Sequence, residues 1–289
     1  MTPPPATDSG RQAPPAAGPA RRWRSGVATA LVTVVGVAAF GWPFLAEPGS
    51  EVAQLGHGAD ASIVFVVLMG LLTVVLLSEL TSGTLDAKGV AVLGVLASAA
   101  GALRVLSAGT AGLEPMFFLL VVAGRVLGAS KGFLLGTLAL LASAFLTAGV
   151  GPWTPFQMVA CGWVALGAGL LPRADGWAER VLLAGYGLAC GMVYGAVMNL
   201  WFWPFMGESA PAGAGYVPGA GAAVNLGHYA VFYATTSLVW DLPRGLLTAA
   251  LVLVAGRPLL RALRRCLRVA RFDAPAPSLP IPALSAPTT

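Results

Sequence analysis

The amino-acid sequence predicts an all-α polytopic membrane protein, on the grounds of its composition and the layout of its apolar runs. Hydrophobic residues make up 57% of the 289 positions, and charged residues make up only 10%. A soluble domain carries about 25% charged residues, so this chain has too few to cover a water-facing surface. The apolar runs are also long enough for helices that cross about 30 Å of hydrocarbon. A large soluble core is the alternative, and the composition disfavours it.

Eight membrane segments are predicted from the apolar runs and the polar interruptions between them. Their bounds are about 26–46, 60–82, 87–108, 114–128, 132–149, 155–172, 178–204 and 230–257. The fourth to sixth segments are short or closely spaced, so we expect them to be tilted or partly broken. Residues 1–25 are predicted to be a disordered tail, and residues 261–289 a basic and then Pro-rich tail.

Basic residues flank the first and last segments, and this pattern predicts the orientation in the membrane. They are Arg11, Arg21, Arg22 and Arg24 before the first segment, and Arg257, Arg261, Arg264, Arg265, Arg268 and Arg271 after the last. By the positive-inside rule both termini lie in the cytoplasm, which requires an even number of spans. Because these charges lie beside membrane segments, the net charge of +5 does not indicate a nucleic-acid partner. The excess of arginine over lysine is typical of a GC-rich bacterial genome and favours a bacterial cell membrane.

Small residues recur at the spacing that lets helix backbones approach closely in lipid. We expect such stripes to make contacts either within the bundle or with a partner subunit, although with 37 glycines in the chain some matches arise by chance. The stripes are Gly94, Ser98 and Ala102; Gly132 and Gly136; and Gly187, Gly191 and Gly195.

Motifs of enzyme chemistry are largely absent from the sequence. No GxxxxGK[ST] sequence occurs, so the chain is not expected to hydrolyse ATP by itself in the P-loop manner. No GxSxG or HExxH sequence occurs either. The cysteines Cys161, Cys190 and Cys266 lack metal-ligand spacing, and the histidines His57 and His228 are far apart in the sequence. We therefore expect no enzyme activity, no metal site and no cofactor.

Charged residues inside the apolar segments are more informative, because each costs about 2.5–3.5 kcal/mol at a helix centre. Asp241 and Arg244 are three residues apart in the last segment and can pair on one helix face. The pair either stabilises the bundle or takes part in ligand binding or coupling. Arg104 ends one segment and Glu114 begins the next, so we expect these two to meet across a short turn. Two further charges lie near inner segment ends, where snorkelling or a cytoplasmic partner would suffice: Glu79 and Arg125.

Polar and aromatic residues gather at the predicted outer face. They are Trp42, Trp153, Phe156, Gln157, Asn199, Trp201, Trp203, Tyr216, Asn225, His228 and Tyr229. An interfacial aromatic belt explains tryptophans at this position. The amides of Gln157 and Asn199 instead suit a pocket that stacks a planar ligand and hydrogen-bonds its edge. Trp163, deeper in the same segment as Gln157, either forms the floor of such a pocket or fills the core.

One block of sequence is specific enough to suggest a family. The block Gly149-Val-Gly-Pro-Trp-Thr-Pro-Phe-Gln-Met158, with glycine-rich flanks at 115–128, 132–136 and 165–171, resembles the S component of an energy-coupling-factor (ECF) vitamin transporter. Asn199-Leu-Trp-Phe-Trp-Pro204 and the span containing Asp241 are similar to actinobacterial members. The likeness covers about six helices. Residues 86–260 are therefore interpreted as a six-helix S-component-like domain, and residues 26–82 as an additional transmembrane hairpin.

The resemblance implies that the chain captures a vitamin at the extracytoplasmic face. A transmembrane T subunit and two ATPase subunits would then drive its release inward. The Pro-Trp-Thr-Pro version looks most like a group associated with cobalamin, although a flavin or a thiamine precursor is equally compatible with the other residues. On this reading residues 205–229 act as a lid.

The residues expected to bind the ligand and the partner subunit follow from this reading together with the patterns above. The ligand-binding set is Trp153, Thr154, Gln157, Trp163, Asn199, Trp201, Arg104, Asn225 and His228. The subunit-contact set is Gly94, Ser98, Ala102, Gly132, Gly136 and Arg125.

Two functions from other classes stay open. A membrane-embedded enzyme acting on a lipid or isoprenoid would need carboxylates or a His/Asp group clustered at one membrane face. The candidates for that role are dispersed: Glu47, Glu51, His57 and Asp60. A structural or assembly subunit without a ligand of its own is the other alternative.

Overall fold

The computed structural model describes residues 19–45, 57–81, 85, 87–107 and 110–269, and these form helices joined by turns, with no β-strand among them. The helices are α1 (Pro19–Leu45), α3 (His57–Thr81), α4 (Ala87–Ser107), α5 (Met116–Leu127), α6 (Ala129–Leu146), α7 (Thr154–Leu170), α8 (Gly176–Asn199), α9 (Ala222–Phe232) and α10 (Leu238–Val269). Three single turns, η1 (Trp203–Phe205), η2 (Gly207–Ser209) and η3 (Tyr233–Ser237), lie between α8 and α10. The predictions made for residues 1–18, 46–56 and 270–289 fall outside the described residues.

Five helical stretches are long and apolar enough to cross a membrane: Gly26–Leu45, Ala87–Ser107, Ala129–Leu146, Gly176–Phe205 and Ala222–Arg268. Shorter apolar helices, Phe65–Thr81, Met116–Leu127 and Thr154–Leu170, occupy the other predicted segments. Large apolar side chains cover the outside of the bundle; Leu106 is 83% exposed and Val254 is 82% exposed. Such a surface suits hydrocarbon and not water. The all-helical membrane fold class is therefore confirmed at this level.

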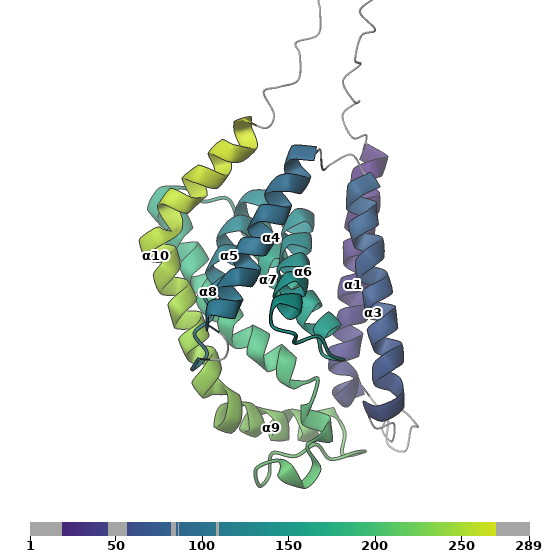
Figure 1. The fold of residues 1–289 in the computed structure, drawn as a ribbon. Helices are drawn as coiled ribbons and strands as arrows, with labels where there is room; N and C mark the ends of the chain where they lie inside the picture. The colour runs from purple at the N-terminus through teal and green to yellow at the C-terminus, as the bar shows by residue number, and fades with distance from the viewer. Residues whose placement is uncertain (1–18, 46–56, 82–84, 86, 108–109, 270–289) are drawn as a thin grey trace, which may run out of the picture.

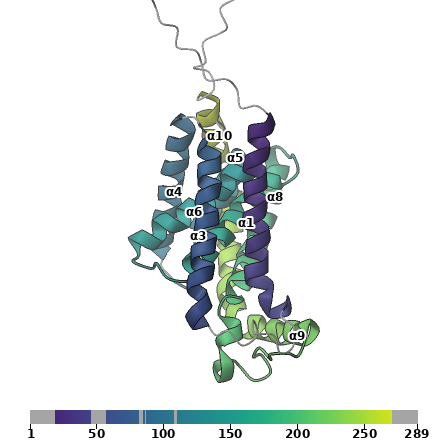
Figure 2. The same ribbon diagram turned by 90° about the vertical axis from the view of Figure 1, so that its right-hand side faces the viewer.

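The helices are arranged as a bundle with a hairpin along one side. Helix α6 packs against both α4 and α7, α8 packs against α10, and α5 joins the two groups through α7 and α10. Helices α1 and α3 lie side by side along the face formed by α6 and α7 (Figures 1 and 2). We call the end of the bundle that carries α9 the α9 end. The opposite end, where α1 begins and α10 finishes, is the terminal end (Figure 1).

The N-terminal hairpin shares its core with the rest of the bundle. Val32 and Phe40 of α1 and Leu68 of α3 are buried in the same apolar cluster as the residues of α5 to α7. The indole N–H of Trp163 on α7 donates a hydrogen bond of 3.2 Å to the hydroxyl of Thr33 on α1. The hairpin is therefore packed against the six-helix part and is not a loosely tethered addition.

The last predicted segment is longer than expected at both ends. It was placed at 230–257, but the helical path begins at Ala222, passes through a π-helical turn at Tyr233–Ser237 and continues to Val269. The π-turn reorients the chain, so that α9 lies across the end of the bundle and α10 runs along it (Figure 1). At the terminal end, Leu260 and Leu263 remain buried and hold the helix beyond the expected start of the basic tail at 261. Helix α1 likewise begins at Pro19, within the region predicted as disordered.

Two of the three small-residue stripes make contacts inside this chain. Gly132 and Gly136 on α6 face α7, where an added Cβ would overlap the carbonyl oxygens of Ala165 and Cys161. Their predicted contact with a partner subunit is corrected to a contact within the bundle, because α7 already buries both residues.

The stripe on α8 also packs inside the bundle, whereas the stripe on α4 does not. Gly187, Gly191 and Gly195 face α10, at Thr248, Gly245 and Asp241. By contrast, the stripe formed by Gly94, Ser98 and Ala102 on α4 is exposed on the surface of the bundle. This last stripe alone stays available to a partner subunit.

The α6–α7 contact can be tested by adding one methyl group. Gly136→Ala is expected to lower the free energy of unfolding by about 1–3 kcal/mol, because the Cβ meets backbone that cannot move aside easily. Thermal unfolding of the detergent-solubilised protein, followed by tryptophan fluorescence, measures the change. Gly185→Ala on α8 is the matched control, because a Cβ there meets nothing within 4 Å and alanine favours a helix. Equal melting temperatures for the two variants would contradict this packing.

Candidate functional site

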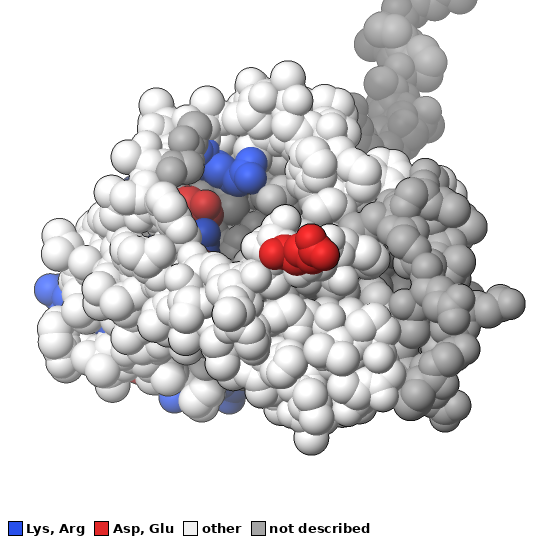
Figure 3. All heavy atoms as spheres, turned by 90° about the horizontal axis from the view of Figure 1, so that it is seen from below, with Lys and Arg blue, Asp and Glu red and all other residues white. Residues whose placement is uncertain are grey.

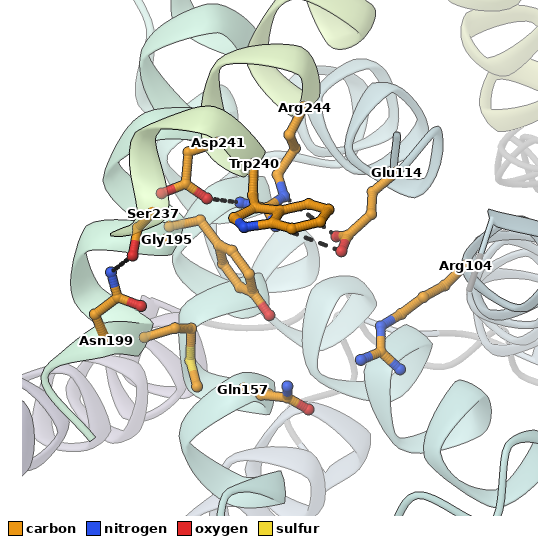
Figure 4. Close-up of a pocket in the computed structure, with 11 residues that line it drawn as sticks. Arg104, Glu114, Gln157, Gly195, Asn199, Ser237, Trp240, Asp241 and Arg244 are labelled. Carbon is orange, nitrogen blue, oxygen red and sulfur yellow. Dashed lines mark hydrogen bonds and ion pairs between the residues drawn. The ribbon is translucent and has the colours of Figure 1, made fainter. Parts of the chain in front are cut away.

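A polar cavity of about 230 Å³ lies at the α9 end of the bundle, between α4, the turn before α5, α7, α8 and the start of α10. The hollow is visible from that end, with basic and acidic side chains inside it (Figure 3). Its lining residues are Arg104, Glu114, Gln157, Tyr194, Gly195, Met198, Asn199, Ser237, Trp240, Asp241 and Arg244 (Figure 4). The cavity is unusual because charged and amide groups meet inside a bundle whose outer surface is apolar.

Arg244 is the centre of a charge network on one side of this cavity. Its guanidinium donates hydrogen bonds to the carboxylate of Asp241 and, at 3.3 Å, to the carboxylate of Glu114. It also donates to the carbonyl oxygen of Gly191 at 3.3 Å. A guanidinium buried in an apolar bundle needs such partners, because an unpaired buried charge costs far more free energy than a paired one. The network joins the start of α5 to α8 and α10.

Aromatic rings and one glycine complete the surroundings of Arg244. The guanidinium carbon lies 5.2 Å from the ring centroid of Tyr194 and 5.5 Å from that of Phe117, within the range of cation–π attraction. Gly195 has no Cβ, and the Asp241 carboxylate occupies the place that a Cβ would take. The small residue on α8 therefore allows Asp241 to lie against that helix.

Arg104 enters the same cavity from the last turn of α4 and has different partners. It donates a hydrogen bond of 3.0 Å to the hydroxyl of Ser143 on α6. We expected Arg104 to meet Glu114 across the turn, but Glu114 pairs with Arg244 instead. Among the described residues, no carboxylate forms an ion pair with Arg104. Gln157 from the first turn of α7 points into the space beside it (Figure 4).

Asn199 and Ser237 form a polar contact on the far side of the cavity from Arg104. The Asn199 amide donates a hydrogen bond of 2.5 Å to the hydroxyl of Ser237 (Figure 4). Asn199 ends α8, and Ser237 belongs to the π-turn that precedes α10. The turn thus brings a hydroxyl to the lining that an uninterrupted helix would place differently. The structure therefore puts three of the predicted ligand-binding residues, Arg104, Gln157 and Asn199, into one cavity.

Three other predicted ligand-binding residues lie beside the cavity and do not line it. Thr154 is buried, and its hydroxyl accepts a hydrogen bond of 2.8 Å from the backbone N–H of Gly151, so it fixes the turn before α7. Trp153 and Trp201 contact each other with ring centroids 5.9 Å apart, and Trp201 also contacts Phe156. These groups support the first turn of α7, which positions Gln157. Their direct role in ligand binding stays a prediction.

Trp163 packs away from the cavity. Its ring lies 5.8 Å from the ring of Phe40 on α1, on the side of α7 that faces the hairpin. The core-filling alternative for Trp163 is therefore the one that the structure supports, and the cavity-floor alternative is corrected. Trp163 packs against α1, a helix that does not belong to the six-helix pattern.

Asn225 and His228 hold the segment that was predicted to be a lid. The Asn225 side chain exchanges two hydrogen bonds with the backbone of Val217, at 2.9 and 3.0 Å. The His228 Nδ1 atom donates to the carbonyl oxygen of Gly215 at 2.7 Å. Both residues brace residues 210–221 against α9 and do not line the cavity, and their role in ligand binding stays a prediction.

Residues 200–221, which we call the outer segment, are anchored to α1 by an aromatic cluster. Trp203 is fully buried, and its indole N–H donates to the carbonyl oxygen of Ala214 at 2.7 Å. Phe44 of α1 stacks on Trp203 at 6.0 Å, and Trp42 contacts Tyr216 at 5.9 Å. Burial in this cluster raises the pKa of the Tyr216 phenol above its ordinary value. None of the described residues that line the cavity belongs to the outer segment.

Arg125 forms a second charge network at the terminal end. It donates to the carboxylate of Glu179 at 2.9 Å and to the carbonyl oxygens of Leu171 and Pro172. Arg264 of α10 reaches the same carboxylate at 2.5 Å. Glu179 is 2% exposed, so both arginines neutralise a buried charge. The predicted subunit contact of Arg125 is corrected, because its guanidinium is used within this chain.

Several of the lining residues are not identified by the sequence patterns alone. Glu114, Asp241 and Arg244 were recognised as costly charges, but the partner of Glu114 was misassigned. Tyr194, Met198, Ser237 and Trp240 were missed, because aromatic, sulfur and hydroxyl side chains are ordinary in membrane helices. The available signal was periodic: Tyr194 and Met198 lie one turn apart on the α8 face that also carries Gly191 and Gly195.

No protein-family model, curated protein or solved structure matches this chain. The interpretation of the cavity therefore rests on its own geometry. That geometry provides a neutralised arginine on one side, a second arginine with a neutral partner on the other, and amide and aromatic groups between them.

Removing Arg244 should destabilise the bundle strongly. Arg244→Gln leaves two carboxylates in a largely buried site without their cation, which is expected to cost about 3–5 kcal/mol of unfolding free energy. Adding Asp241→Asn and Glu114→Gln removes those charges and is expected to recover part of the loss. Thermal unfolding in detergent measures both variants, with Arg265→Gln at an exposed position as the control. A triple variant less stable than Arg244→Gln alone would contradict the network.

Proposed function

We propose that this chain is the ligand-capturing membrane subunit of a multi-subunit vitamin importer of the ECF type. The observation that carries the proposal is the polar cavity at the α9 end, set in a bundle with an apolar surface. Charged and amide groups inside such a bundle are costly unless they serve a purpose, and binding sites are the commonest purpose. The cavity opens at one end of the bundle and so suits capture from one side of a membrane.

Energy for import would come from partner subunits. The sequence has no P-loop motif, so the proposed importer needs separate ATPase subunits, joined through a transmembrane T subunit. The exposed stripe of Gly94, Ser98 and Ala102 on α4 is the surface we assign to the T subunit, because small residues permit close helix approach. With the α9 end facing the outside of the cell, both termini and the basic end of α10 face the cytoplasm.

The size of the cavity bears on which vitamin is captured. Pockets that enclose drug-sized ligands measure about 300–1,000 Å³, and this cavity of about 230 Å³ is smaller. Cobalamin is larger than a drug-sized ligand and would need the helices around the cavity to move apart. The present shape favours a smaller vitamin or vitamin precursor, and cobalamin becomes one arm of the test.

Ligand capture is tested by purifying the full chain from membranes of its natural host and analysing it by native mass spectrometry. A bound small molecule, released on denaturation, is expected. A tagged chain is also expected to bring down a T subunit and two ATPase subunits. A corrinoid in the released fraction would establish cobalamin. Recovery of neither a small molecule nor ATPase subunits would overturn the proposed function and favour an assembly subunit, whereas chemical conversion of a bound lipid would favour the enzyme alternative.

Gln157 provides a residue-level test of the same cavity. Gln157→Ala should weaken binding of the released molecule by about 1–3 kcal/mol, because it removes an amide that faces the cavity. Trp163→Phe is the matched control, since Trp163 lies on the same helix but faces α1, and it should leave affinity unchanged. Equilibrium titration of both variants with the released molecule measures the difference. Equal affinities for the wild-type chain and Gln157→Ala would remove Gln157 from the site.

A further inference from the structure

The two arginines of the cavity differ in how completely their charge is matched. Arg244 has two carboxylate partners, a carbonyl oxygen and two aromatic rings. Arg104 has the hydroxyl of Ser143 as its hydrogen-bond acceptor, and no described carboxylate pairs with it. A guanidinium has five N–H donors, so Arg104 retains donors that one hydroxyl cannot satisfy.

The direction of Arg104 matters as much as its partners. It lies in the last turn of α4 and could have extended outward from the end of the bundle. Instead it lines the cavity, and its guanidinium points toward the space beside Gln157 (Figure 4). Among the described residues, the Gln157 amide has no hydrogen-bond partner. The N–H donors of Arg104 and the unpaired amide of Gln157 thus face the same part of the cavity.

The remaining charges of the cavity are already committed. Glu114 and Asp241 both pair with Arg244, so a cationic ligand would have to compete with that guanidinium. The second oxygen of Asp241 has no partner, but it is sealed from solvent and presses against Gly195. It is therefore not available to a molecule in the cavity. An anionic group beside Arg104 meets no such competition.

Aromatic surfaces define the rest of the ligand. The indole of Trp240 lies across the cavity between Arg104 and Asp241 (Figure 4). Tyr194 also lines the cavity. Flat faces of this kind favour a planar group by stacking. The volume of about 230 Å³ limits that group to a small ring system.

From these observations we propose that the captured ligand is a small planar carboxylate, with its carboxylate bound by Arg104 and Gln157 and its ring beside Trp240 and Tyr194. Guanidinium groups bind carboxylates through two parallel N–H···O hydrogen bonds, which gives both affinity and orientation. This assignment rests on the proposed function, since it names the class of ligand taken by the same cavity.

The charge of the ligand is tested with three probes of nearly the same shape. Benzoate, benzamide and benzylamine carry a negative, a neutral and a positive group on one ring. Ligand-observed NMR with the full chain in nanodiscs is expected to show benzoate binding at least about tenfold more tightly than either of the others. Inorganic phosphate, an oxyanion without a ring, is expected to compete only weakly.

Variants connect this preference to Arg104. Arg104→Gln, which can keep a hydrogen bond to Ser143, should remove the preference for benzoate over benzamide. Arg104→Lys keeps the charge but loses the fork and should retain part of it. Arg265→Gln, at an exposed position on the terminal end of α10, is the charge-matched control and should leave all three affinities unchanged.

Several results would overturn the assignment. These are no detectable binding of benzoate, equal affinities for the three aromatic probes, tightest binding of benzylamine, or an unchanged benzoate preference in Arg104→Gln. Competition by phosphate as strong as by benzoate would overturn the planar-ring part. Ligand capture itself is judged separately, by the molecule that co-purifies with the wild-type chain, so a neutral or cationic molecule found there would refute the carboxylate while leaving the proposed function intact.

Discussion

A guanidinium buried among apolar helices must be neutralised, and much of this bundle is arranged around that requirement at Arg244. Its partners come from the turn before α5, from α8 and from α10 itself. At the terminal end the same three helices meet again, where Arg125 and Arg264 share the carboxylate of Glu179. Two charge networks at opposite ends of α5, α8 and α10 therefore specify which helices are neighbours. In lipid this matters more than in water, because apolar contacts alone discriminate weakly between helix partners.

Close packing provides the second constraint and, with it, the place of the cavity. Gly132 and Gly136 bring α6 against α7, while Gly187 and Gly191 bring α8 against α10. Between these two tight pairs, at the α9 end, lie the side chains that line the cavity. The cavity lies at that junction. Its lining therefore draws on both tight pairs, with Gln157 from α7 and with Asp241 and Arg244 from α10.

The hairpin and the outer segment pack against each other at the cavity end. Helix α1 contributes Trp42 and Phe44 to the aromatic cluster that surrounds Trp203, and Thr33 to a hydrogen bond with α7. A segment that could have closed over the cavity as a lid is instead fastened to the hairpin. Movement at this end would therefore involve α1 together with the outer segment, and this coupling distinguishes the chain from a bare six-helix bundle.

The membrane class, the helix-rich fold and the approximate limits of α4 to α7 could be predicted from the sequence, because hydrocarbon thickness and hydropathy act locally along the chain. The sequence also marked Glu114, Asp241 and Arg244 as costly, since an intramembrane charge needs a reason wherever it lies. The sequence could not show that Glu114 pairs with Arg244, which is 130 residues away, and not with Arg104, which is nearer in the sequence. Nor could it show that Thr154, Asn225 and His228 satisfy backbone groups while Trp240 and Ser237 face the cavity. Those outcomes depend on helix rotation and on the π-turn at Tyr233–Ser237, which are decided by long-range packing, and only the tertiary structure brings such distant residues together.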